Sequence, residues 1–164
     1  MSGWVAIAAG GAMFGVITTV AAIAAASQPQ QRASAVFPGA VRVTLDVAAD
    51  EPARQRGLMH RAALGSNEGM IFVFEEPDDY HFWMKNTLIP LDIIWLDERG
   101  AILFIHHAVP PCGNQDPEDD RCPTWGPPAG TRALYVIEVQ AGFARTHDLR
   151  SGQRVLLSGV PALR

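Results

Sequence analysis

The chain has 164 residues, a formal net charge of −4 and 18% charged residues, which fits one domain with short appendages. The acidic balance argues against a nucleic-acid partner, because nucleic acids select a basic surface. It also argues against attachment of the folded surface to anionic lipid, so membrane contact is expected only through an N-terminal segment.

The N-terminal segment, residues 1–26, predicts export. No ionisable side chain precedes Arg32, and the run from Trp4 to Ala26 is apolar or small. Such a run can cross a bilayer, which takes about 20 residues. Small residues at Ala24–Ser27 suit a cleaved signal peptide, whereas the length of the run and its uncharged start suit an uncleaved membrane anchor. Both alternatives place the domain in the periplasm, either released after cleavage or tethered to the inner membrane.

Residues 27–39 are polar and rich in Gln and Pro, and we expect them to form a flexible tether. The folded domain is then expected at residues 40–164. Its first strand is predicted at Val41–Val47, because apolar and polar residues alternate there without a break.

A short helix is predicted at Pro52–Arg56, since Asp50 offers a carboxylate cap and proline suits the first turn. Later apolar segments predict strands at Gly69–Phe74, Tyr80–Met84, Leu91–Leu96, Ala101–Val109, Arg132–Gln140 and Val155–Leu157, with a helical turn at Phe143–Asp148. About seven short strands with little helix predict an all-β domain, a single antiparallel β-sandwich or jelly-roll-like barrel with one or two short helices. The segment at Leu91–Leu96 is apolar on both faces except at Asp92, which favours a central strand.

The two cysteines, Cys112 and Cys122, flank a polar loop in this exported context. A disulfide would hold that loop, and closing a loop of this size stabilises a protein by about 2–3 kcal/mol. Zinc bound by both cysteines with His106 and His107 is the alternative. The spacing matches no usual zinc pattern, and adjacent histidines in a strand point to opposite faces, so the disulfide is favoured.

The stretch His81–Asp92 concentrates aromatic, amide, hydroxyl and charged groups between two predicted strands, and it contains the single lysine, Lys85. Strand alternation predicts that Phe82 and Met84 face the core. Asp92 and Glu138 lie in apolar strands, where a carboxylate is costly unless donors or a cation meet it. We therefore expect a partly buried polar cluster of Arg56, Lys85, Asn86, Asp92 and Glu138. This cluster is either a structural salt-bridge network or a ligand-binding or catalytic site.

Other chemistries find weaker support. The methionines Met59, Met70 and Met84 lie in apolar runs and are expected to be core residues rather than copper ligands. Trp125, in a proline-rich loop, is the tryptophan expected to be exposed for sugar stacking, whereas Trp95 is expected in the core. The alternating oxygen ligands in the loop between the cysteines lack the glycine of a calcium-binding loop. No nucleophile elbow or phosphate-binding loop is found, and no metal or cofactor is expected.

Several motifs in order identify a resemblance to a known family. They are Arg56-Gly57-Leu58-Met59, Gly69-Met70-Ile71-Phe72-Val73-Phe74, Phe82-Trp83-Met84-Lys85-Asn86-Thr87, Pro90-Leu91-Asp92-Ile93-Ile94, Val136-Ile137-Glu138-Val139 with Ala141-Gly142, and Gly152 with Val155. Together they resemble the domain of unknown function 192 family of bacteria and archaea, over about residues 40–160.

The resemblance implies a compact, jelly-roll-like β-domain and no known activity. It also implies a shared role for seven matching residues, namely Arg56, Trp83, Lys85, Asn86, Thr87, Asp92 and Glu138. Where the family usually has Gly-Asp, this chain has Gly152-Gln153, so no carboxylate chemistry is expected there.

We expect an exported, non-catalytic domain that binds a small molecule or an envelope protein through the region around Lys85 and Asp92. A cell-envelope enzyme, for instance one acting on a glycan, is an alternative that would use Asp92 and Glu138 as paired carboxylates. A structural accessory without a pocket is a further alternative. A concave site on which both carboxylates converge would favour the enzyme, and a pocket with one of them would favour binding.

Overall fold

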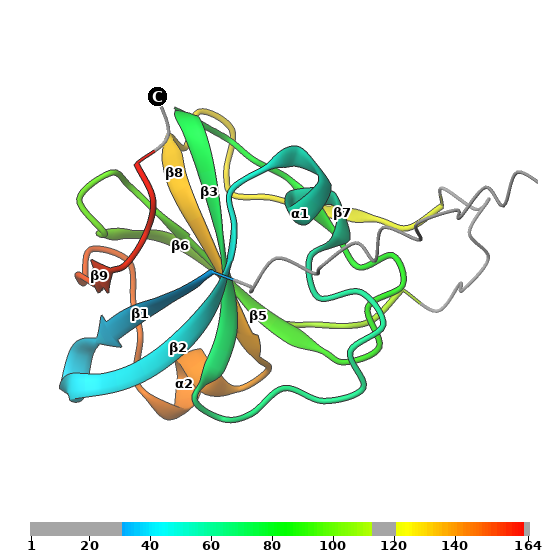
Figure 1. Ribbon diagram of the computed structural model, residues 1–164, viewed down its shortest axis with the longest axis horizontal. Coiled ribbons are helices and arrows are strands. Elements are labelled where there is room, and N and C mark those ends of the chain that lie inside the picture. Colours follow the sequence, from blue (N-terminus) through cyan, green and yellow to red (C-terminus); the bar gives the residue numbers. More distant parts are fainter. Residues whose placement is uncertain (1–30, 113–120, 163–164) are drawn as a thin grey trace, which may run out of the picture.

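A computed structural model describes residues 31–112 and 121–162, which form one mostly β domain (Figure 1). The all-β prediction is therefore confirmed. The strands are β1 Arg32–Phe37, β2 Val41–Ala48, β3 Glu68–Asp78, β4 Phe82–Trp83, β5 Leu91–Leu96, β6 Ile102–Val109, β7 Thr124–Trp125, β8 Ala133–Gln140 and β9 Leu156–Ser158; the helices are η1 Pro38–Ala40, α1 Glu51–Arg56 and α2 Phe143–Thr146.

Seven strands form one sheet in the order β6-β5-β8-β3-β2-β1-β9, and β4 pairs with β7 in a small separate sheet. The large sheet is open rather than closed into a barrel. It is also mixed, because β2 and β3 run parallel while the other neighbours are antiparallel. The chain reaches the parallel position through α1, as parallel strands need a crossover connection. The expected purely antiparallel arrangement is corrected at this pair.

The expected tether at residues 27–39 is wrong in its second half. Residues Arg32–Phe37 form β1, which pairs with β2 and β9, and Ala33, Ala35 and Phe37 are buried. Ala33, Ala35 and Phe37 point to the buried face of this strand, and Arg32, Ser34 and Val36 point to the other face. The domain thus includes residues 32–37, which precede the predicted boundary at residue 40.

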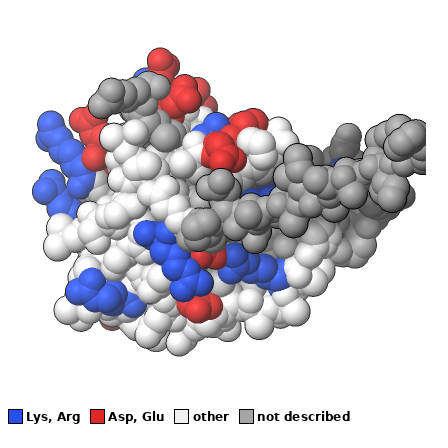
Figure 2. Space-filling model, in the orientation of Figure 1, with Lys and Arg blue, Asp and Glu red and all other residues white. Residues whose placement is uncertain are grey.

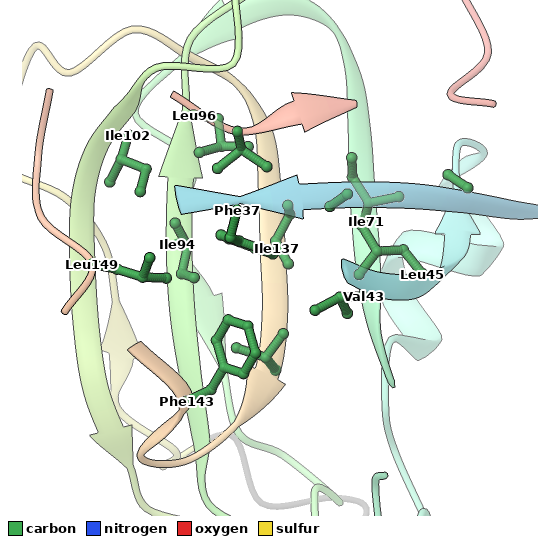
Figure 3. Packing of buried hydrophobic residues seen from close by; sticks show 14 of the residues in the cluster. Phe37, Val43, Leu45, Ile71, Ile94, Leu96, Ile102, Ile137, Phe143 and Leu149 are labelled. Atoms are coloured by element: carbon green, nitrogen blue, oxygen red, sulfur yellow. The ribbon is translucent and has the colours of Figure 1, made fainter. Parts of the chain in front are cut away.

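The large sheet carries a hydrophobic core on each face. One core contains Ile71, Ile94, Ile137 and, from α2, Phe143 (Figure 3). The other contains Leu58, Met70, Phe72, Met84, Ile93, Trp95 and Val136, and Ala53 of α1 packs against it. All six residues of β5 are buried, which confirms its predicted central place.

The short helix α1 begins as predicted. The Asp50 carboxylate accepts a hydrogen bond of 2.8 Å from the backbone N–H of Ala53, and Gly57 caps the helix after its last residue, Arg56. Further on, Gly69 lets β3 approach β8 closely, since a Cβ there would lie 2.5 Å from the Glu138 carbonyl oxygen.

Cys112 and Cys122 form a disulfide with a Cα–Cα distance of 5.7 Å, as predicted. The zinc alternative is excluded because both thiols are used in this bond. The acidic loop between the cysteines and the predicted signal peptide or anchor at residues 1–26 lie outside the described residues. Within the described ranges, no helix has the length and apolar character needed to cross a membrane.

Candidate functional site

Asp92 is completely buried in β5, and its carboxylate is satisfied by the backbone. Oδ1 accepts hydrogen bonds from the N–H groups of Ala108, at 2.7 Å, and Gly142, at 3.2 Å, while Oδ2 accepts one from Ala144 at 2.8 Å. The donors belong to β6, to the turn before α2 and to α2 itself. Charge-assisted bonds of this kind are about twice as strong as neutral ones. Asp92 therefore fastens three elements together and has a structural role.

Glu138 lies on the opposite face of the sheet. In the register of β5 and β8, Asp92 is paired with Val139, whereas Glu138 is paired with Ile93, and on its other side Glu138 is paired with Met70 of β3. Paired residues share a face and neighbours along a strand alternate. The predicted cluster of Asp92 with Glu138 is therefore wrong, and so is the paired-carboxylate enzyme that depended on it.

A small cavity, the inner cavity, brings together four of the seven candidate residues. It has a volume of about 30 Å³ and lies between α1, β3 and the segment around β4. The candidates in its wall are Arg56, Trp83, Thr87 and Glu138, and they are joined by Arg54, Gln55, Gly57, Leu58, Met59, Phe72 and Phe82. The sequence motifs thus meet in space at Glu138 rather than at Asp92.

Lys85 and Asn86 lie beside this cavity. The Lys85 side chain is buried, and its Nζ lies over the Trp83 ring at 5.2 Å from the ring centroid. Asn86 has a positive φ of 55°, its Nδ2 lies 4.0 Å from the Met59 sulfur, and its carbonyl accepts a bond of 2.8 Å from the His60 N–H. The turn that follows β4 is in this way held against the segment after α1.

A larger depression, the aromatic pocket, adjoins the inner cavity and shares part of its wall. Its volume is about 610 Å³. It is lined by Glu51, Arg54, Gln55, Phe72, Phe74, Glu75, Glu76, Tyr80, His81, Phe82 and Trp83. Phe74 stacks on Tyr80, and Phe72 and Phe82 meet edge to face at 4.8 Å between centroids. The amino-acid sequence carries no signal for this pocket, because its aromatic rings come from segments that look like ordinary strand ends.

The Glu138 carboxyl has an unusual environment. The residue is only 4% exposed, and among residues 31–112 and 121–162 its carboxyl has no hydrogen bond or ion pair. Burial raises its pKa from 4.5 to about 8. At neutral pH Glu138 is therefore mainly an uncharged acid that can donate a hydrogen bond into the inner cavity.

The remaining tryptophans differ in part from expectation. Trp95 is fully buried, as predicted. Trp125 is partly buried against His106, with ring centroids 5.4 Å apart, and its buried indole N–H has no partner among the described residues. Trp83, which is 41% exposed, is instead the accessible ring. The expected exposure of Trp125 is corrected because β7 packs it onto β6.

Metal ligands do not gather in this part of the chain. Met70 and Met84 are core residues, as predicted, and Met59 lines the inner cavity. Across the described residues, no group of three or more His, Cys, Asp or Glu side chains is placed to hold a metal ion.

Comparison with known proteins agrees with the motifs at this site. The family model of domain of unknown function 192, described as "Uncharacterized ACR", matches residues 32–157. The chain belongs to this family. The match begins where β1 begins, so it includes the strand that the sequence had assigned to a tether.

Two solved structures resemble the domain. One is a protein from Sinorhizobium meliloti 1021 that is provisionally described as a transcription regulator, with 26% identity, a TM-score of 0.65, and coverage of 82% of this chain and 98% of that one. The other is a protein of unknown function from Novosphingobium aromaticivorans DSM 12444, with 29% identity, a TM-score of 0.62, and coverage of 76% of this chain and 83% of that one. No curated protein matches.

Proposed function

We propose that this domain of unknown function 192 binds a small molecule that lies in the aromatic pocket and reaches into the inner cavity. The observation that carries the proposal is the nearly completely buried Glu138 carboxyl, which has no partner in the described residues and lines the inner cavity. Among the described residues, Trp125 Nε1 is the one completely buried side-chain N or O atom without a partner, so the Glu138 oxygens keep some access to the inner cavity, where a ligand can reach them. A ligand that accepts a bond from this carboxyl accounts for its presence.

The surroundings of Glu138 favour a role in ligand binding over a purely structural role. Trp83 is a large, exposed ring beside the cavity, where an apolar or planar ligand can stack. The aromatic pocket has a volume of about 610 Å³, within the range of about 300–1,000 Å³ that is usual for small-molecule sites. Asp92 supplies the contrast, because its donors are all present in the fold.

The charge of this chain argues against a role in DNA recognition, although one structural neighbour is provisionally described as a transcription regulator. The net charge is −4. On the described part of the face in Figure 2, basic side chains are mixed with acidic ones rather than gathered into one stripe. Nucleic-acid binding depends on a basic surface.

We also propose that the domain works outside the cytoplasm, released after signal cleavage or held at the inner membrane by residues 4–26. The disulfide between Cys112 and Cys122 supports this, since such bonds persist in oxidising compartments. Cell fractionation, with detection of the tagged chain in the periplasmic or membrane fraction, tests it.

The binding proposal is tested by thermal unfolding of the purified full-length protein in the presence of a small-molecule library. A ligand of the native state raises the midpoint. Its effect should be lost in Trp83→Ala and Glu138→Leu and retained in Leu156→Ala, an exposed position on β9. If every stabilising compound acts equally on all four proteins, the site is elsewhere. If none acts on the unaltered protein, the proposal fails.

A further inference from the structure

Three of the candidate residues in the wall of the inner cavity have side chains that can donate hydrogen bonds. Thr87 contributes a hydroxyl and Arg56 a guanidinium, and among residues 31–112 and 121–162 neither side chain makes a hydrogen bond or ion pair. Glu138 contributes its carboxyl. A guanidinium only donates hydrogen bonds, and a hydroxyl or a protonated carboxyl can each donate one.

From these residues we infer that the ligand carries a carboxylate, which enters the inner cavity beside Arg56, Thr87 and Glu138, on an apolar or aromatic body that lies against Trp83. This inference rests on the proposed binding function and adds the chemical class of the ligand. A carboxylate accepts from several donors at once and matches the planar fork of arginine.

The two arginines near the cavity have different environments. Arg54 donates to the carbonyls of Ala49 and Val73, pairs with Glu51, and lies over Phe74. Its charge is therefore committed to the fold. Arg56, the last residue of α1, is exposed and lines the cavity with no such contact in the described residues. Arg56 is thus the guanidinium that a ligand can engage.

The volumes of the inner cavity and the aromatic pocket indicate a ligand with a small terminal group and a larger body. The inner cavity, at about 30 Å³, holds only a small terminal group, whereas the aromatic pocket, at about 610 Å³, holds a ring or short chain. The two spaces are adjacent and share wall residues, namely Arg54, Gln55, Phe72, Phe82 and Trp83. This shape fits a compact arylalkyl acid.

An amine is the opposite candidate, and the charges argue against it. The charged side chains in the wall of the inner cavity are Arg54 and Arg56 from α1, while β3 and the β4 segment contribute Phe72, Phe82, Trp83 and Thr87, which are uncharged. Glu138 is kept mainly uncharged at neutral pH by the burial that raises its pKa. An ammonium group would meet like charge and no carboxylate ready to pair with it.

The test compares three probes that share one body: 3-phenylpropionate, 3-phenylpropionamide and 3-phenylpropylamine. Binding to the full-length protein is measured by isothermal titration at pH 6.5 and pH 9, with tryptophan fluorescence as a second signal. We expect the acid to bind most tightly, and to bind more weakly at pH 9 because deprotonated Glu138 repels it. Arg56→Met should weaken the acid by about tenfold, since a hydrogen bond to a charged group contributes that much, and should leave the amide unchanged.

Glu138→Gln keeps a neutral donor at this position, so it should retain binding of the acid probe and lose the difference between the two pH values. Tightest binding of the amine, or acid binding that strengthens at pH 9, would overturn the carboxylate inference and leave the binding function standing. Binding of the three probes with equal affinity would overturn it too. Absence of binding by the probes, together with a library that yields no ligand, would defeat both proposals.

Discussion

Two buried carboxylates on adjacent strands, Asp92 and Glu138, have opposite environments. The Asp92 carboxylate accepts hydrogen bonds from three backbone N–H groups, which belong to β6, to the turn before α2 and to α2. Glu138 receives no partner from the described residues, and burial keeps its pKa near 8. The difference separates a carboxylate that stabilises the fold from one that the fold leaves available. Burial alone therefore does not distinguish the two carboxylates, whereas their hydrogen-bond partners do.

The largest effect is expected for Asp92→Ala. It leaves the N–H groups of Ala108, Gly142 and Ala144 without their acceptor, and each buried unsatisfied donor costs about 1–3 kcal/mol. We expect the free energy of unfolding to fall by about 4 kcal/mol in urea denaturation. Asp92→Asn, which keeps one oxygen, should lose about half as much. An Asp92→Ala protein as stable as the unaltered one would remove the structural role.

The pH dependence of stability should reveal Glu138. Its pKa is 4.5 in the unfolded chain and about 8 in the fold, so above pH 4.5 the unfolded chain releases a proton that the native state keeps. The stabilisation is complete below pH 4.5 and is lost as the pH rises through 8. The slope reaches about 1.4 kcal/mol per pH unit for one proton. Urea denaturation at several pH values should give a steeper decline for the unaltered protein than for Glu138→Gln; parallel curves would contradict a raised pKa.

A smaller effect of opposite sign is expected for Glu138→Leu. The new side chain lies between Met70 and Ile93 and removes a buried polar group without a partner in the described residues. We expect a gain of about 1 kcal/mol in the free energy of unfolding, together with loss of ligand binding. A clear loss of stability would mean that the carboxyl supports the fold, as Asp92 does.

The smallest effect on stability is expected for Trp83→Ala. The ring is 41% exposed, and its neighbours include Lys85 Nζ and the walls of the two spaces. We expect the unfolding free energy to change by less than about 1 kcal/mol, while binding in the aromatic pocket is lost. Chemical denaturation and titration with the same sample measure both. A large destabilisation with intact binding would reverse the assignment of this residue.

Much of the fold was predictable from local signals. The alternation at Val41–Val47, the cap at Asp50 and the apolar run at Leu91–Leu96 each act within a few residues, and all correspond to observed elements. The boundary at β1 was not predictable in this way, since Arg32–Phe37 becomes a strand by pairing with β2 and β9. Pairing with the next strand and with the C-terminal β9 overrides a composition that is typical of a tether.

The candidate site likewise combines features that the sequence determines with features that depend on the tertiary structure. By itself, the sequence determined which residues carry the polar chemistry, that Asp92 faces the same way as Ile94, and that Glu138 faces the same way as Val136, because side chains alternate along a strand. Only the tertiary structure decided that these two faces are opposite, since the register of β5 against β8 depends on packing across the whole sheet. It also decided that Arg56, Trp83 and Thr87 join Glu138, because a cavity exists only where separate elements meet.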